Sequence, residues 1–285
     1  MSRLCFDCHL STVDKLVKKF NLSAVERDKL LHDARELLQK YSGCPNPIIA
    51  TYIQRLASQK IKCDALYREE KCHANTVLLS DYQYWEIFVN QSHNPFQTAV
   101  KLAVAGNIID YGAHSQPEDI TAKINELVKL KFAIDDTINL YNRIKAAKKI
   151  LYLGDNAGEI VFDKLLLETI NHPNVVFAVR GRPVINDATI DDAMFVGMDK
   201  LCKVITNGYD APSTLLEHCS QDFVAEYKEA DLIISKGQGN FEGLMNSGGS
   251  NIVFMLMAKC NPIAELLGVK KGSLIVKENI KQKVV

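Results

Sequence analysis

The sequence lacks an excess of charge of either sign. Its 285 residues hold 34 Lys and Arg against 34 Asp and Glu, so the formal net charge is zero. A protein that binds nucleic acid or an anionic membrane surface through its overall charge carries a basic excess. The sequence therefore predicts neither nucleic acid nor a membrane as a partner.

Long apolar runs are also absent. No run approaches the roughly 20 residues that a membrane-spanning helix needs, and the opening MSRLCFDCHL has no apolar core of the kind found in signal peptides. The eight cysteines are scattered along the chain and do not form the compact framework of a small secreted domain. We therefore expect a cytoplasmic protein with mostly reduced thiols.

The residues that are present form two kinds of pattern, which meet near residue 147. Before this point, segments such as SAVERDKLLHDARELLQKY (23–41) repeat apolar residues three and four apart, as amphipathic helices do. After it, helical segments alternate with five short apolar runs: KILYLG, NVVFAVRG, KVITNG, ADLIISKG and GSLIVK. This alternation predicts an α/β fold with a mainly parallel, doubly wound sheet.

Polar residues follow most of the predicted strands. The segments concerned are LGDNAGE, VRGRPVINDAT, TNGYDAPST and SKGQGNFEG. In open parallel sheets, ligands bind outside the carboxyl ends of the strands. We therefore expect these four loops to meet at one edge of the sheet and to form a binding site.

Asp155 and Asn156 lie in the first of these loops, between a predicted strand and a predicted helix. The N-terminus of a helix favours an anion such as phosphate, but the oxygens of these two side chains would repel it unless a cation lay between. Oxygen ligands suit Mg²⁺ or Mn²⁺, which accept phosphate as a further ligand. We interpret the pair as metal ligands; the alternative is a helix cap or turn former.

Two further loops offer a third ligand and a cation. Asp187 is our choice of third ligand, with a helix cap as the alternative. We expect Asp191 and Asp192 on a helix surface. Lys236 directly follows an apolar strand, where it could neutralise phosphate, and Gly237 would permit close approach of the backbone. The alternative for Lys236 is a solvated loop lysine.

Several segments together resemble the damage-control phosphatases, a family of metal-dependent phosphatases. They are GDNAGEIVFD, VINDAT, SKGQGNFEG and the segment NPFQTAVKLAVAGNIIDYGA at 94–113. The N-terminal CFDC and the closing KCNPIAELLGVKKGSLIV resemble its prokaryotic, cysteine-containing subgroup. The resemblance spans nearly the whole chain in the family's order, with departures at Ser213 and Asn94 that leave the substrate open.

The resemblance implies a Rossmann-like three-layer α/β/α domain over residues 93–285, with a helical lead-in at 93–147, and an N-terminal helical domain over residues 1–92. It implies a divalent metal, Mg, Mn, Co or Ni, at Asp155, Asn156 and Asp187, and a phosphate contact from Lys236. It also implies that the amides of residues 156–160 face phosphate. Further residues expected at the substrate are Gly158, Glu159, Asn107, Asp110, Gly237 and Asn240.

The reaction implied is hydrolysis of phosphomonoesters of small metabolites, such as sugar phosphates or damaged phosphorylated cofactor intermediates, by metal-activated water. Attack by Asp155 itself is the alternative mechanism, although a D-x-D motif is absent. Two other functions stay open. One is an S-adenosylmethionine-dependent carboxyl methyltransferase. The other is a metal- or redox-binding protein built on Cys5 and Cys8 with Cys72, Cys260 or His9.

Overall fold

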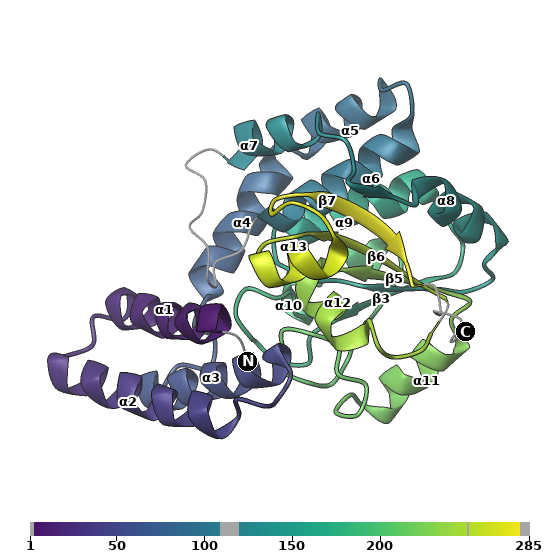
Figure 1. Ribbon diagram of the computed structural model, residues 1–285. Helices are drawn as coiled ribbons and strands as arrows, with labels where there is room; N and C mark the ends of the chain where they lie inside the picture. The colour runs from purple at the N-terminus through teal and green to yellow at the C-terminus, as the bar shows by residue number, and fades with distance from the viewer. Residues whose placement is uncertain (1–2, 109–119, 250, 280–285) are drawn as a thin grey trace.

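The computed structural model describes residues 3–108, 120–249 and 251–279 (Figure 1). Its α-helices are α1 (Arg3–Lys19), α2 (Ala24–Lys40), α3 (Asn46–Ile61), α4 (Arg68–Ser80), α5 (Tyr82–Asn90), α6 (Pro95–Ala105), α7 (Ile120–Leu127), α8 (Thr137–Ala146), α9 (Glu159–Ile170), α10 (Ile190–Phe195), α11 (Gln221–Glu229), α12 (Gly237–Leu244) and α13 (Asn261–Leu267). Two short 3-10 helices are η1 (Gly106–Ile108) and η2 (Met198–Lys200). The strands are β1 (Ile134–Asp135), β2 (Ile150–Leu153), β3 (Val175–Val179), β4 (Lys203–Thr206), β5 (Leu232–Lys236), β6 (Ile252–Met257) and β7 (Leu274–Glu278).

The strands form one seven-stranded sheet in the order β1-β7-β6-β5-β2-β3-β4. Strands β2 to β6 are parallel, whereas β7 runs antiparallel to β6 and β1 runs parallel to β7. From β2 the chain moves outward through β3 and β4 and then returns to β5 on the other side of β2. The strand order therefore reverses between β2 and β5, and such a switch point is where open α/β sheets bind ligands.

Alternate residues of the central strands face opposite helical layers, because successive side chains of a strand point to opposite faces. Tyr152, Phe177 and Ile234 pack with α6 and α9 on one face. On the other face, Leu151 and Ile233 pack with α11, α12 and α13. This arrangement confirms the predicted three-layer α/β/α fold (Figure 1).

Helices α1, α2 and α3 form a lobe beside the sheet, at the lower left of Figure 1. They have an apolar core of their own, which includes Val13, Leu30, Leu38, Ile49 and Ile53. Helices α4 and α5 instead contribute to the core of the sheet through Ala74, Leu78, Trp85 and Val89. The apolar cores thus divide the chain after α3, while the domain boundary predicted at residue 92 stays a prediction.

Side chains of this lobe bind the loops at the strand ends. Arg55 binds Asp210 through two nitrogens, with Nε 2.8 Å from Oδ2. Asn46 donates to Glu242 at the end of α12, with Nδ2 3.2 Å from Oε2. These bonds hold the lobe over the carboxyl ends of the parallel strands.

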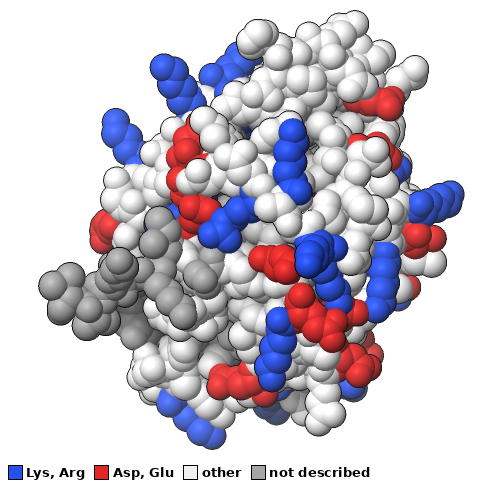
Figure 2. All heavy atoms as spheres, turned by 90° about the vertical axis from the view of Figure 1, so that its right-hand side faces the viewer, with Lys and Arg blue, Asp and Glu red and all other residues white. Residues whose placement is uncertain are grey.

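The surface follows the balanced composition. On the face drawn in Figure 2, basic and acidic side chains are interleaved, without a broad field of one sign. None of the helices within the described ranges is both long and apolar enough to span a bilayer.

Candidate active site

A cavity of about 210 Å³ lies between the helical lobe and the strand ends. One wall is formed by the loops after β2 and β3, with Asp155, Asn156 and Asp187. The opposite wall comes from α1 and α3, with His9, Asn46 and Gln54 among its residues. The cavity therefore lies at the carboxyl ends of the strands, where the sequence predicts a site, and beside the switch point of the sheet.

Backbone pairing brings the three predicted metal ligands together. Asn156 and Asp187 form an isolated antiparallel bridge, and the amide of Ala188 donates to the carbonyl of Asp155 at 2.7 Å. This pairing joins the loop after β2 to the loop after β3. Asp155, Asn156 and Asp187 are each less than 10% exposed and line the same cavity, and their role as ligands stays a prediction.

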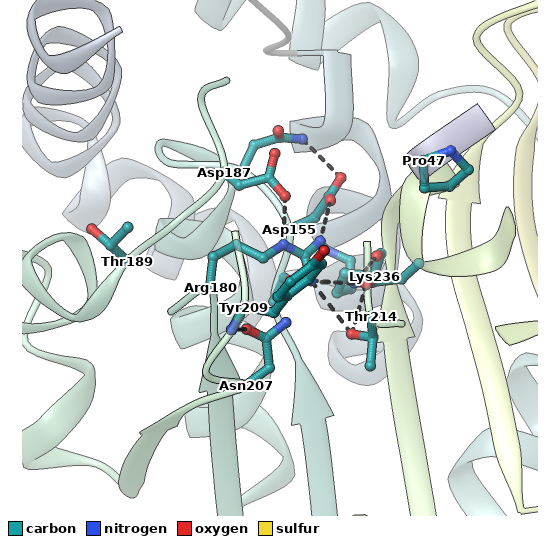
Figure 3. Close-up of polar contacts among 12 residues, drawn as sticks. Pro47, Asp155, Arg180, Asp187, Thr189, Asn207, Tyr209, Thr214 and Lys236 are labelled. Atoms are coloured by element: carbon teal, nitrogen blue, oxygen red, sulfur yellow. Dashed lines mark hydrogen bonds and ion pairs between the residues drawn. The ribbon is translucent and has the colours of Figure 1, made fainter. Parts of the chain in front are cut away.

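Arg180, directly after β3, connects these residues and has no role in the sequence-based prediction. Its Nε donates to Asp187 Oδ2 at 2.6 Å, and its Nη2 lies 3.4 Å from Asp155 Oδ1 (Figure 3). Its Nη1 donates to Asn240 at 2.9 Å and lies 3.4 Å from the Thr214 hydroxyl. A charged residue after a strand is usually solvated, so nothing in the local sequence separates Arg180 from an exposed arginine.

Hydrogen bonds with the buried side chains of Asn107 and Glu159 fix Asp155 and Asn156. Asn107 donates through Nδ2 to Asp155 Oδ2 at 2.9 Å and to Glu159 Oε2 at 2.7 Å. Asn156 donates to the same two oxygens, each at 2.9 Å. The nitrogen end of the Asn156 amide is thus directed at carboxylates, so its oxygen is the end that suits a cation. Glu159 and Asn107 orient the predicted ligands in this arrangement.

Lys236 lies outside the cavity and is fully buried. Its Nζ donates to Glu159 Oε1 at 2.7 Å, Asp163 Oδ1 at 2.5 Å and the carbonyl of Ala103 at 2.8 Å. A lysine ammonium has three donors, and all three are used here. The structure therefore does not bring this ammonium to the predicted ligands, and its phosphate contact stays a prediction.

The buried charges around the cavity do not balance. Asp155, Glu159, Asp163 and Asp187 are opposed within this buried cluster by Arg180 and Lys236, which leaves two carboxylates in excess. Burial, followed by the charges of Asp187 and Glu159, raises the pKa of Asp155 to about 8. Burial also raises the pKa of Asp163 to about 6. An excess of two carboxylates with an amide oxygen beside them fits a divalent cation that prefers oxygen ligands.

The amides at the start of α9 are partly occupied by protein acceptors. The amide of Ala157 donates to the carbonyl of Asn186 at 2.9 Å, and that of Gly158 donates to Asn75 Oδ1 at 2.6 Å. Asn75 lies on α4, so this side chain takes a place at the helix N-terminus that an anion could use. The predicted contact of Gly158 and its neighbours with phosphate stays a prediction.

Gly237 and Asn240 pack beneath the ligands. Gly237 has a φ of +79° and lies against the Asp155 carboxylate. Asn240 is fully buried and donates to the carbonyls of Gly154 and Lys236 at 3.2 and 2.8 Å. Neither lines the cavity, so both support the loops of the site from behind. Asp110, also predicted at the substrate, lies outside the described residues.

Lys259 is a second residue that the sequence-based prediction did not include. It follows β6, lines the cavity and is only partly buried, and its amide donates to Gln238 Oε1 at 3.0 Å. Its charge lowers the pKa of Asp155 against the larger effects that raise it. The apolar run IVFMLM before Lys259 could have placed this residue at the end of a strand. Such a run does not by itself distinguish a strand from a buried helix.

Asp192 corrects one prediction. It is buried rather than on a helix surface, and its Oδ2 pairs with Lys71 Nζ at 2.6 Å while Oδ1 accepts from Asn75 at 3.1 Å. It also accepts from the amide and hydroxyl of Thr189 at the start of α10. Lys71 and Asn75 lie on α4, more than 100 residues away in the sequence, so the local pattern could not reveal these two partners. Asp191 is exposed, as predicted.

All eight cysteines lie within the described residues, and none of them forms a disulfide. Cys5, Cys8, Cys260 and His9 line the cavity, whereas Cys72 lines a different hollow. Among the described residues, only one group of three His, Cys, Asp or Glu side chains has ligand atoms that all lie within 4.8 Å of one another. It consists of the exposed His32 and Glu36 and the partly buried Asp33. No three of the cavity thiols and His9 are therefore grouped as metal ligands.

The chain is similar to several known proteins. A damage-control phosphatase ARMT1-like domain model matches residues 1–275. A damage-control phosphatase from Pyrococcus horikoshii is 42% identical over 187 residues, which are 65% of each chain. One from Archaeoglobus fulgidus is 36% identical over 247 residues, 85% of each chain. An uncharacterized protein from Methanocaldococcus jannaschii is 42% identical over 95% of this chain and 93% of its own.

The fold has a solved counterpart. The crystal structure of a DUF89 family protein from Pyrococcus horikoshii superposes with a TM-score of 0.88 at 32% identity, covering 98% of this chain and 99% of that one. The match therefore includes the helical lobe as well as the sheet. With the domain model spanning residues 1–275, these findings show that the chain belongs to the damage-control phosphatase family.

Proposed function

We propose that the protein is a divalent-metal-dependent phosphatase that hydrolyses phosphomonoesters of small metabolites. Its family supports the phosphatase role. One observation supports the metal dependence: Asp155, Asn156 and Asp187 line one wall of a cavity whose buried cluster carries two more carboxylates than cations. The size of the cavity, about 210 Å³, suits a small substrate such as a sugar phosphate or a damaged phosphorylated cofactor intermediate.

Asp155, Asn156 and Asp187 would hold the metal ion, which can be Mg²⁺, Mn²⁺, Co²⁺ or Ni²⁺. Bound there, the ion would offset charge on the phosphate oxygens and lower the pKa of a water molecule. Asn107 and Asn156 restrain the Asp155 carboxylate through bonds to Oδ2, and Arg180 lies at its Oδ1. A carboxylate whose two oxygens already accept bonds is a poor nucleophile, which supports water over Asp155 as the attacking group.

Lys259 is the cation that this proposal assigns to the phosphate group. It lines the cavity, whereas Lys236 is buried beside Glu159 and Asp163. A point charge of this kind neutralises phosphate oxygens without requiring one fixed geometry. Lys236 contributes indirectly, because it holds Glu159, which in turn orients Asn156.

The test is phosphate release from p-nitrophenyl phosphate and a panel of sugar phosphates, with each of the four metals against EDTA. We expect metal-dependent turnover by the unaltered protein, loss of turnover in Asp155→Ala, and full turnover in Asp191→Ala, which removes an exposed carboxylate of a nearby helix. Turnover that persists in EDTA would contradict the metal dependence. The absence of turnover from folded protein with every metal would contradict the phosphatase role.

A further inference from the structure

Arg180 places a fixed positive charge between two predicted metal ligands. Its side chain is 2% exposed, and its guanidinium carries five N–H donors and one positive charge. Figure 3 shows it directed at Asp187, Asp155 and Thr214. Its partners come from four separate segments, the loops after β2, β3 and β4 and helix α12, so the charge is held in place from several sides.

The charge of Arg180 changes what a phosphate group would meet. The buried cluster of Asp155, Glu159, Asp163 and Asp187 carries four negative charges when ionised, and Arg180 and Lys236 reduce the sum to two. With a divalent ion added, this cluster is neutral; without Arg180 it would be negative by one charge. A phosphate anion is therefore repelled more strongly by the cluster that lacks Arg180.

The same charge opposes the metal ion. The guanidinium occupies acceptor positions on both carboxylates, with Nε 2.6 Å from Asp187 Oδ2 and Nη2 3.4 Å from Asp155 Oδ1. It also repels a second cation in a buried place, where charges are weakly screened. Arg180 thus disfavours binding of the metal ion and favours binding of the phosphate anion.

We propose that Arg180 is a positioning residue that sets the charge of the site: it weakens divalent-metal binding and strengthens phosphate binding to the metal-loaded protein. This inference rests on the proposed function, because it takes Asp155 and Asp187 as metal ligands. Replacement of a residue with a merely structural role would weaken the binding of both the metal ion and phosphate, since a disordered site binds neither well.

The experiment uses full-length protein and titration calorimetry. Mn²⁺ is titrated into metal-free protein, and inorganic phosphate into Mn²⁺-saturated protein, for the unaltered chain, Arg180→Gln and Arg182→Gln. Arg182 is a matched control: it lies two residues away, is exposed and forms no ion pair with any described residue. In Arg180→Gln we expect Mn²⁺ to bind at least about tenfold more tightly and phosphate at least about tenfold more weakly. Arg182→Gln should change neither by more than about twofold.

Removal of Arg180 leaves buried carboxylates unpaired, which can unfold the metal-free variant. Two measurements cover this case. Without metal, the melting temperature of Arg180→Gln should be lower than that of the unaltered protein. Addition of Mn²⁺ should raise it by more than it raises that of the unaltered protein. Arg180→Lys keeps the charge, and both of its affinities should stay within a few-fold of the original values.

Three outcomes would overturn the inference: Mn²⁺ and phosphate affinities that fall together in Arg180→Gln, affinities that do not change, or an Arg180→Lys variant that shows the same opposite shifts. The failure of the proposed function looks different. An unaltered protein that binds no Mn²⁺ removes the metal site and this inference with it. One that binds Mn²⁺ and phosphate but hydrolyses no ester removes only the catalytic assignment.

Discussion

Gly237 and Asp155 are in such close contact that a Cβ atom placed on Gly237 would lie 1.8 Å from Asp155 Oδ2. The φ of Gly237 is +79°, which residues with a side chain rarely adopt. Glycine at this position therefore lets the end of β5 approach the predicted metal ligand.

We expect Gly237→Ala to lose more than about 90% of its metal-dependent phosphate release and to lower the free energy of unfolding by about 2–4 kcal/mol, because the methyl group displaces the carboxylate. Urea unfolding and a phosphate assay measure the two effects. Gly272→Ala is the control, since Gly272 has a φ of +87° but open space around its Cβ position. Equal effects in the two variants would mean that backbone strain alone is responsible.

Lys236→Met should destabilise the protein by about 3–5 kcal/mol, because it leaves Glu159 and Asp163 buried without their cation. Chemical denaturation measures this change. Lys200→Met, at an exposed position, should stay within about 0.5 kcal/mol of the original stability. A stable Lys236→Met protein that has lost only phosphate binding would instead place Lys236 at the substrate.

Lys259→Met should lower kcat/KM for phosphomonoesters by about 100-fold, since Lys259 lines the cavity and supplies charge that water cannot replace. Steady-state assays with p-nitrophenyl phosphate test this, with Lys270→Met, an exposed residue, as the control. An unchanged kcat/KM would exclude a contact between Lys259 and the phosphate group.

Asn75→Ala should lower the free energy of unfolding by about 1–3 kcal/mol. It leaves the buried Gly158 amide without its acceptor and Asp192 Oδ1 without its donor. Thr76→Ala, on the exposed side of the same helix, is the comparison. If the Asn75 variant unfolds at the same urea concentration as the unaltered protein, another group or a water molecule satisfies the Gly158 amide.

Stability should fall on acidification below pH 6.5 through His9. Burial lowers the pKa of His9 from 6.5, so in this range the unfolded chain binds a proton that the folded chain does not. The free energy of unfolding then decreases as the pH falls toward the folded pKa, by at most about 1.4 kcal/mol per pH unit. His9→Gln should flatten this slope in urea titrations from pH 7 to 5. His73→Gln, at an exposed position, should retain it.

The sequence predicted the type of fold because its signals are local. Strands β2 to β5 and β7 lie in the five apolar runs, and the loop that contains Asp155 follows β2 as expected. Strand β6 was not recognised, since IVFMLM is apolar throughout and buried on both faces, without the alternation that identifies a strand. The antiparallel direction of β7 depends on long-range pairing and has no local signal.

The candidate site was predicted where its residue types are unusual for their positions and missed where they are not. Asp155 and Asn156 attracted attention because a carboxylate in such a turn needs a partner. Arg180 was not singled out, although it follows a predicted strand as Lys236 does, and Lys259 was not because the strand before it was not recognised. The burial of Arg180 and the position of Lys259 at the cavity depend on loops from four strands, and no single segment of the sequence encodes how these loops meet.

The two walls of the cavity are far apart in the order of synthesis. Helix α1 supplies His9 to one wall, whereas Lys259 and Cys260 lie some 250 positions later. A ribosome adding about 5–20 residues per second therefore needs tens of seconds between the two walls in the slower case. During that time the α1–α3 lobe can complete its own core. A nascent chain that ends before β6 lacks Lys259 and Cys260 and therefore does not contain the whole cavity. Activity, unlike the folding of the lobe, can begin only after the cavity residues up to Pro262 have been translated.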